Sequence, residues 1–302
     1  MKKIAVVSAS GIGDALIFQT AAHQLRMHGF EPTTFSDHLP SFGAWLQGAS
    51  FAPQPHLDQI PEIFNCFDAI FLQHDNSAKA RAIKKLPLPV YTFYGEHLLP
   101  NHDPWKSGFD FVCDLNFTMV DNLKTCLRTI FSLDDVTSDN GFKAPSSLVL
   151  RKHNRRVVLH PLSGAAHKNW TRSKFLKLAI LLDAQGFEPI FASSPQERSE
   201  WGGPELNSLE ALASLIYESG FFIGNDSGPG HIASLMGVPH LIIGWNRRQM
   251  SLWRPGWTRG ALILPPRWIP NWKGFRLRES HWQKFITTKN VLNLFNRSVL
   301  SN

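Results

Sequence analysis

The stretch Asp226-Ser227-Gly228-Pro229-Gly230-His231 has the composition of an anion-binding site. The apolar residues Phe221–Ile223 before it predict a buried strand, and Gly237 ends the short helix predicted after it. Asp226 and Ser227 are favourable N-cap residues, and Pro229 suits a first helical turn. The start of a helix offers unpaired backbone N–H groups and a partial positive charge, to which His231 can add a side-chain donor. The stretch therefore predicts a site for an anion such as a diphosphate.

Two other interpretations of this stretch exist. Strand-turn-helix junctions with a capping Asp are common structural features. The stretch Asp226-Ser227-Gly228-Pro229 also resembles the surroundings of the nucleophilic serine in chymotrypsin-like proteases. That second interpretation is disfavoured, because a triad needs a base and an acid from other parts of the fold and the surrounding strand and helix pattern does not suit all-β barrels.

A second candidate site is the small-residue loop Ser163-Gly164-Ala165-Ala166-His167-Lys168. It follows a predicted strand at 156–161 and precedes a predicted helix at 173–185. Backbone N–H groups of such a loop can approach a phosphate closely, and Lys168 supplies the opposite charge. The alternative is that Lys168 is an ordinary surface lysine.

A third candidate is the turn Ser10-Gly11-Ile12-Gly13-Asp14, between an apolar strand at 3–9 and a helix predicted over 15–28. Gly11 and Gly13 form part of a dinucleotide fingerprint, but Leu16 replaces the third small residue, so NAD binding is weakly indicated. Asp14 follows a glycine turn at the mouth of a parallel sheet, where open α/β sheets bind ligands. It is either an N-cap or a catalytic carboxylate.

These three stretches together resemble the heptosyltransferase-like glycosyltransferases, the family of the ADP-heptose:lipopolysaccharide heptosyltransferases. The matching patterns are Gly13-Asp14 with Leu25-Arg26, His160-Pro161-x-x-Gly164…Lys168-x-Trp170, and Asp226-Ser227-Gly228-x-x-His231-x-Ala233-x-x-x-Gly237-Val238-Pro239. The chain departs from the family pattern at Thr171, where proline is usual, and at Trp245-Asn246, where small and hydroxylated residues are usual.

The resemblance implies a role for each site residue. Asp14 is the expected catalytic base, and Gly11 and Gly13 lie on the acceptor side. The donor diphosphate is expected at Lys168, at His231 and at the N–H groups of Ser227–Gly230, with Asp226 on the donor hydroxyls. The expected donor-binding residues are Ser163, Gly164, Lys168, Asp226, Ser227, Gly228, Pro229, Gly230 and His231.

Alternation of strands and helices predicts an α/β protein with parallel sheets. The resemblance implies the GT-B architecture, in which two Rossmann-like domains face each other across a cleft. We expect an acceptor-binding domain at 1–145, a nucleotide-sugar-binding domain at 155–280, and a helix within 281–302 that packs back toward the first domain. The irregular stretch 94–106 is a candidate acceptor-side loop.

Composition limits the class of protein. The chain has 302 residues, 43% of them hydrophobic and 18% charged, which fits a globular protein of two domains. No stretch approaches the roughly 20 apolar residues of a membrane span. Three cysteines without metal-ligand spacing indicate reduced thiols in the cytoplasm.

The net charge of +7 is concentrated in 246–284, where arginine and tryptophan alternate and only Glu279 is acidic. This segment suits an anionic partner, or else packs as core and solvated surface.

The predicted function is inverting glycosyl transfer, with heptose from ADP-heptose as the expected donor substrate and a lipopolysaccharide-core or related glycan as acceptor. No cofactor is expected, and no metal, because the chain has no Asp-x-Asp sequence. Expected partners are the nucleotide sugar, a phosphorylated glycolipid and the anionic inner face of the inner membrane, but no nucleic acid. The alternatives are an inactive binder of anionic glycolipid or nucleotide sugar, an NAD-dependent dehydrogenase, and a serine hydrolase using Ser227.

Overall fold

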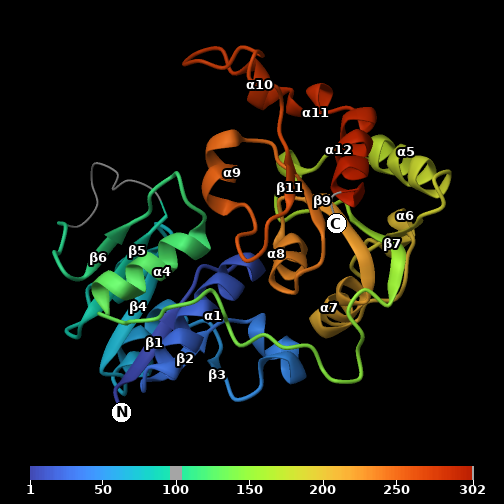
Figure 1. Ribbon diagram of the computed structural model, residues 1–302. Coiled ribbons are helices and arrows are strands. Elements are labelled where there is room, and N and C mark those ends of the chain that lie inside the picture. Colours follow the sequence, from blue (N-terminus) through green and yellow to red (C-terminus); the bar gives the residue numbers. More distant parts are fainter. Residues whose placement is uncertain (96–103, 301–302) are drawn as a thin grey trace. The chain divides into compact units, whose positions relative to one another are not determined.

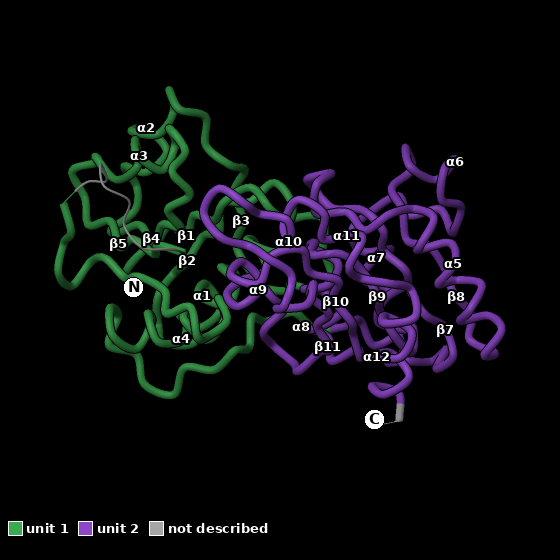
Figure 2. Tube along the Cα trace, turned by 90° about the horizontal axis from the view of Figure 1, so that it is seen from above, with its two compact units in different colours: residues 1–143 green, residues 144–302 purple. Residues whose placement is uncertain are grey.

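The protein is described by a computed structural model that covers residues 1–95 and 104–300 (Figure 1). The chain divides into two compact units, Met1–Lys143 and Ala144–Asn302, which Figure 2 shows in different colours. Most of the candidate acceptor-side loop at 94–106 lies outside the described residues.

The first unit is built on a six-stranded parallel sheet in the order β3-β2-β1-β4-β5-β6. Its strands are β1 (Lys3–Val7), β2 (Glu31–Phe35), β3 (Ser50–Ala52), β4 (Ala69–His74), β5 (Val90–Tyr94) and β6 (Asp110–Val112). Its helices are α1 (Ile12–Met27), α2 (Ile60–Phe64), α3 (Ala78–Lys84) and α4 (Met119–Ile130), with the 3₁₀ helices η1 (Leu39–Leu46) and η2 (Leu57–Gln59). The alternating strands and helices expected from the sequence are confirmed.

Helices cover both faces of this sheet. One face packs against α1 and α4, where Phe18 of α1 stacks on Phe71 of β4 with ring centroids 5.3 Å apart. The other face packs against α2 and α3 in a core that includes Phe35 and Phe64. Burial on both faces explains why β1 and β4 are continuous apolar runs without alternation.

The second unit has a five-stranded parallel sheet in the order β11-β10-β9-β7-β8. Its strands are β7 (His153–His160), β8 (Glu188–Phe191), β9 (Ser219–Asn225), β10 (His240–Ile243) and β11 (Ala261–Ile263). Its helices are η3 (Ala166–Lys168), α5 (Arg172–Asp183), α6 (Arg198–Trp201), α7 (Leu209–Tyr217), α8 (Gly228–Leu235), α9 (Arg247–Trp253), α10 (Leu277–Ser280), α11 (Trp282–Phe285) and α12 (Thr288–Leu300). In Figure 1, β9 lies within the sheet, and α8 continues directly from it.

The C-terminal helix α12 belongs to the core of the second unit. It packs against α5 and β11, and its side chains Val291 and Phe295 are buried. Phe295 lies edge-on to Phe187 and Phe221, with ring centroids 5.1 and 5.2 Å away. The apolar face of α12 is thus used inside its own unit, and packing of this helix toward the first domain stays a prediction.

Phe295→Ala should therefore destabilise the second unit by about 3–5 kcal/mol, the usual cost of removing a buried phenylalanine ring. The measurement is chemical denaturation of the full chain followed by near-UV circular dichroism, with Asn293→Ala on the exposed face of α12 as the control. Equal stability of the two variants would show that α12 does not contribute to this core.

Candidate functional site

The carboxyl ends of two neighbouring strands, β7 and β9, bring the two candidate donor-binding stretches together. β7 ends at His160 and is followed by the loop of Ser163 and Lys168, whereas β9 ends at Asn225 and is followed by Asp226. Because the strands are parallel and paired, their carboxyl ends lie at the same edge of the sheet. This edge is where open α/β sheets bind ligands.

Lys168 and Asp226 form an ion pair at this edge. The Lys168 Nζ atom lies 3.0 Å from Asp226 Oδ2, and the carboxylate side chain is 7% exposed. Burial raises the pKa of Asp226, while the charge and hydrogen bond of Lys168 oppose that rise. The structure thus brings together two predicted site residues that lie 58 positions apart in the sequence.

The first turn of α8 lacks a side-chain cap. Ser227 occupies the N-cap position, but its hydroxyl contacts His160 Nδ1 at 3.2 Å and the carbonyl oxygen of Asn225 at 3.2 Å. Gly228 begins the helix, and Pro229 lies in its first turn, as predicted. The orientation of Ser227 leaves the helix start with its positive partial charge and no acceptor from the cap side chain. Such a start suits an anionic ligand.

Gly230 allows α8 to approach the sheet. A Cβ atom at this position would lie 2.7 Å from Ile242 Cδ1 of β10, closer than side chains tolerate. The glycine therefore has a packing role in placing the helix start, in addition to its position in the predicted anion site.

His231 is buried on the first full turn of α8, with 5% of its surface exposed. Burial, together with the positive charges of His240 and Lys168, lowers its pKa to about 4. Its Nδ1 atom has no hydrogen-bond partner in the described part of the chain. Near neutral pH the ring is uncharged, so it can serve a ligand as a hydrogen-bond donor but not as a cation.

The contact between Ser227 and His160 tests the hydrolase alternative. A serine nucleophile needs a base that accepts its proton near neutral pH. Burial lowers the pKa of His160 to about 4, which makes it a weak base under those conditions. The geometry therefore favours an orienting contact for Ser227 over an activated nucleophile.

Asn225, which the sequence analysis did not single out, holds the lysine loop against β9. It is fully buried, its Oδ1 accepts a hydrogen bond from the Trp170 N–H at 3.0 Å, and its Nδ2 donates to the Pro161 carbonyl oxygen. Both ends of the loop that carries Lys168 are thereby fixed. A polar residue that ends an otherwise apolar strand was the available signal for this role.

The end of the same loop is fixed by aromatic side chains. The Trp282 Nε1 atom donates to the His167 carbonyl oxygen at 2.9 Å. The His167 ring lies edge-on to Trp245, with centroids 4.9 Å apart. Trp245, one of the departures from the family pattern, therefore lies beside the residue that precedes Lys168.

In the first unit, Asp14 lies in the first turn of α1 and is not the N-cap. The N-cap residue is Gly11, so the capping interpretation of Asp14 is wrong. Gln73 Nε2, at the end of β4, donates to Asp14 Oδ1 at 2.5 Å, and Gln73 Oε1 accepts from the Ala9 N–H at 2.9 Å. A Cβ atom on Gly11 would lie 2.5 Å from Asp14 Oδ2, so a side chain at this position would displace the carboxylate.

Gln73 is the second residue that the sequence analysis missed. Its amide is oriented by Ala9 and in turn orients the Asp14 carboxylate, which remains half-buried at the carboxyl end of β1. Gly13 lies beside Asp14 in the same turn of α1. The predicted acceptor-side residues Gly11 and Gly13 therefore flank a carboxylate that is fixed in orientation and partly open to solvent.

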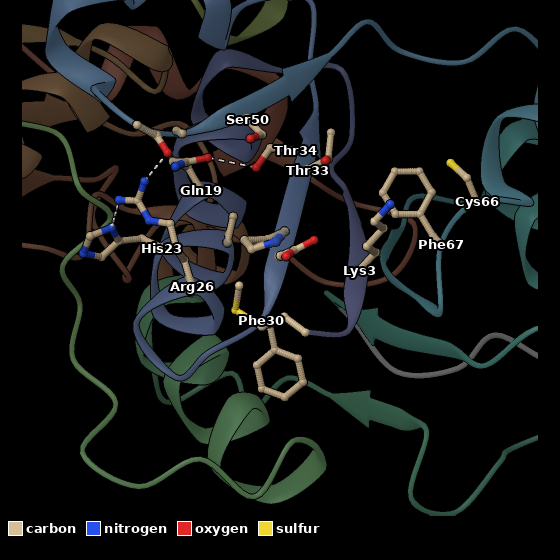
Figure 3. A pocket seen from close by; sticks show the side chains of 16 residues that line it. Lys3, Gln19, His23, Arg26, Phe30, Thr33, Thr34, Ser50, Cys66 and Phe67 are labelled. Carbon is tan, nitrogen blue, oxygen red and sulfur yellow. Dashed lines mark hydrogen bonds between the residues drawn. The ribbon is translucent and has the colours of Figure 1, made fainter.

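A cavity of about 540 Å³ in the first unit lies at the opposite edge of the sheet (Figure 3). Its lining includes Lys3, Glu31 and Ser50, the first residues of β1, β2 and β3, and none of the predicted site residues. Figure 3 shows Arg26 beside His23, and the Arg26 guanidinium donates to the Gly48 carbonyl oxygen. The Arg26 guanidinium is thus engaged by the protein itself, and the residues of the candidate site in this unit lie at the other edge of the sheet.

Among the described residues no group of His, Cys, Asp or Glu side chains could hold a metal ion. No helix in the described ranges has the length and apolar character of a membrane span.

Comparison with known proteins finds relatives of the segment that carries the candidate site. Residues 131–255, which include Lys168 and Asp226–His231, match the model of glycosyltransferase family 9 (heptosyltransferase). Lipopolysaccharide heptosyltransferase 3 of Escherichia coli K12 is 21% identical over 235 residues, which cover 69% of this chain and 66% of that protein. A second Escherichia coli protein of that name is 28% identical over 121 residues, 35% of each chain.

Solved structures agree on the fold. The glycosyltransferase family 9 protein of Veillonella parvula matches with a TM-score of 0.71 and 16% identity, covering 100% of this chain and 98% of that one. The ADP-heptose lipopolysaccharide heptosyltransferase II of E. coli matches with a TM-score of 0.68 and 14% identity, covering 99% of both chains. The protein has the GT-B fold. Residues 131–255 of the chain are similar to glycosyltransferase family 9, and the whole chain shares the fold of solved heptosyltransferase structures.

The free energy of unfolding should decrease as the pH is lowered, because His231 has a lowered pKa in the folded protein. The unfolded chain protonates this histidine near pH 6.5, whereas the folded protein does so only near pH 4. Between these values the unfolded state binds more protons, so stability is lost as the pH decreases, by up to about 3 kcal/mol for this group.

The measurement is the free energy of unfolding of the wild type and of His231→Gln from pH 7 to pH 4, pH values chosen to bracket the shift. The stability difference between the two proteins should shrink as the pH decreases. A stability difference that stays constant with pH would contradict the lowered pKa of His231 in the folded protein.

Proposed function

We propose that this protein is an inverting, metal-independent glycosyltransferase that transfers a sugar from a nucleoside diphosphate sugar to a glycan acceptor. The observation that carries the proposal is the Lys168–Asp226 ion pair at the carboxyl edge of the second sheet, beside the uncapped start of α8. A lysine and a helix start supply positive charge for a diphosphate, and the carboxylate supplies an acceptor for donor hydroxyls.

The second unit provides the donor half of the reaction. We assign the diphosphate to Lys168, to the backbone N–H groups at the start of α8 and to the loop of Ser163 and Gly164. His231 serves as a neutral donor because burial lowers its pKa. As the bond from the anomeric carbon to the diphosphate oxygen breaks, negative charge collects on the leaving group, where these donors stabilise it.

The first unit provides the base. The acceptor hydroxyl gives its proton to the Asp14 carboxylate, and its oxygen forms the new bond to the anomeric carbon on the face opposite to the leaving diphosphate. Gln73 holds the carboxylate in one orientation, which lowers the cost of aligning it with the acceptor. Inversion at the anomeric carbon follows from this single displacement.

The relatives support ADP-heptose as donor and a lipopolysaccharide core as acceptor. Two relatives are named lipopolysaccharide heptosyltransferase 3, and one matched structure is an E. coli heptosyltransferase with ADP. Because such acceptors are membrane-anchored glycolipids, we place the reaction at the cytoplasmic face of the inner membrane. An inactive protein that only binds a nucleotide sugar or anionic glycolipid is the alternative that the experiments below exclude or establish.

Asp14→Asn should lower the turnover of sugar transfer by roughly 10²-fold or more, because the amide cannot accept the acceptor's proton. Nucleotide affinity should not change, since Asp14 lies in the first unit. The measurement is steady-state release of the nucleoside diphosphate, with affinity from calorimetry. Normal turnover in the folded variant would show that Asp14 is not the catalytic base.

Gln73→Met provides the companion test, because it removes the hydrogen bond to Asp14 with little change in volume. The Asp14 carboxylate should then lose its fixed orientation, and the turnover of sugar transfer should fall while nucleotide affinity is unchanged. Gln47→Met, at an exposed position of the same unit, is the matched control. Turnover equal to that of the wild type would limit Gln73 to a packing role.

Lys168→Ala should weaken binding of the nucleoside diphosphate by about 1.5–3 kcal/mol, the range for a charge-assisted hydrogen bond, with a smaller effect on the nucleoside. Lys177→Ala, an exposed lysine of α5, is the control. Equal losses for nucleoside and diphosphate would contradict a direct role of Lys168.

Activity should be unchanged by EDTA, because the lysine and the helix start carry the positive charge that a metal ion would otherwise supply.

A further inference from the structure

A short segment of the second unit presents aromatic side chains to solvent. Between β11 and α10, Trp268, Trp272 and Phe275 are 79%, 61% and 47% exposed. These are large apolar surfaces within eight residues of sequence, and exposed apolar clusters of this kind mark interaction sites. Figure 1 shows the chain just before α10 reaching away from the sheet of its unit.

Two of these residues are held at the tip of a tight turn. The backbone of Trp272 and Phe275 is paired by hydrogen bonds in both directions, with N to O distances of 3.1 and 2.9 Å. Gly274 has a φ of +89°, a left-handed conformation that glycine adopts without strain. The two rings lie against each other with centroids 5.3 Å apart. The tip therefore has a defined shape in which both rings stay exposed.

The base of this segment is attached firmly to the unit. Ile269 is buried, and Arg278 donates from its backbone N to the Pro270 carbonyl oxygen and from Nη1 to the Arg267 carbonyl oxygen. Glu279 Oε1 accepts from Asn271 Nδ2 at 3.1 Å and from Asn246 Nδ2 at 2.8 Å. The rings are thus exposed although the segment that carries them is fixed to its unit.

The charge around the rings is positive. Arg267, Lys273 and Arg276 are exposed in the same segment, and Glu279 is the only acid between positions 246 and 284. Glu279 is shared with two asparagines, and its contact with Arg276, at 3.4 Å, involves an exposed guanidinium that solvent screens. Most of the positive charge is therefore available to a partner.

We propose that residues 267–276, here called the aromatic turn, dock the protein on an anionic lipid bilayer. Tryptophan rings prefer the interface between lipid headgroups and acyl chains, and basic side chains beside them pair with anionic headgroups. A partner protein would satisfy the apolar rings, but three exposed cations with a single neighbouring acid, Glu279, fit a surface of repeated negative charge better. The proposal is independent of the chemistry assigned to Asp14 and Lys168.

The test is flotation of the full chain with phosphatidylcholine vesicles, with and without phosphatidylglycerol, across a series of salt concentrations. The wild type should float with the anionic vesicles, and the bound fraction should decrease with salt because the attraction is screened. Neutral vesicles should bind it weakly. Absence of binding to anionic vesicles at low salt would overturn the proposal.

Two variants separate the apolar and electrostatic contributions. Trp272→Ser with Phe275→Ser should reduce the partition coefficient roughly tenfold or more at all salt concentrations, because two ring contacts with the bilayer are lost. Changing Arg267, Lys273 and Arg276 to Gln should reduce it about fivefold per charge at low salt and remove most of the salt dependence. Phe117→Ser with Ile180→Ser, two exposed apolar residues elsewhere, should bind like the wild type.

Nucleoside diphosphate affinity, measured by thermal shift on the same variants, distinguishes this proposal from the proposed function. It should be unchanged in the Trp272/Phe275 variant, whatever the activity of the protein. Loss of nucleotide affinity in that variant would assign the aromatic turn to the donor site and overturn the docking role. A change from dimer to monomer without any change in vesicle binding would assign it to self-association instead.

Discussion

The candidate site of the second unit depends on one partly buried ion pair, Lys168–Asp226, with 3.0 Å between charged atoms. A buried carboxylate without a partner is costly, so the two side chains stabilise each other in the absence of ligand. Their meeting requires β7 and β9 to be neighbours in a parallel sheet and Asn225 to hold the intervening loop. The fold has thus positioned and partly desolvated the cation to which the proposed function assigns a diphosphate.

The first unit has a similar arrangement. Asp14 follows β1, and Gln73 is the next-to-last residue of β4, a strand that pairs directly with β1. The Gln73 amide orients the Asp14 carboxylate by a hydrogen bond that adds no opposite charge. In the proposed function, the first unit contributes a base and the second a diphosphate site.

The sequence predicted the α/β architecture and most elements because long buried strands and capped helices leave strong local patterns. It did not reveal β3, β6 and β11, since three residues are too few to show a period. Lys168 and Asp226 were predicted from local composition and resemblance. Gln73 and Asn225 were not, because their roles arise from contacts with residues 59 and 55 positions away. The packing of α12 on α5 and β11 was not predicted either, since an apolar stripe does not identify its partner.

The most direct test of the account is the product of the reaction with ADP-heptose and a heptose-deficient lipopolysaccharide core. Mass spectrometry of the acceptor and NMR of the new glycosidic bond report both transfer and stereochemistry. The account predicts an acceptor heavier by one heptose residue, with the anomeric configuration opposite to that of the donor. A retained configuration, or an unmodified acceptor under conditions in which the protein binds ADP-heptose, would contradict it.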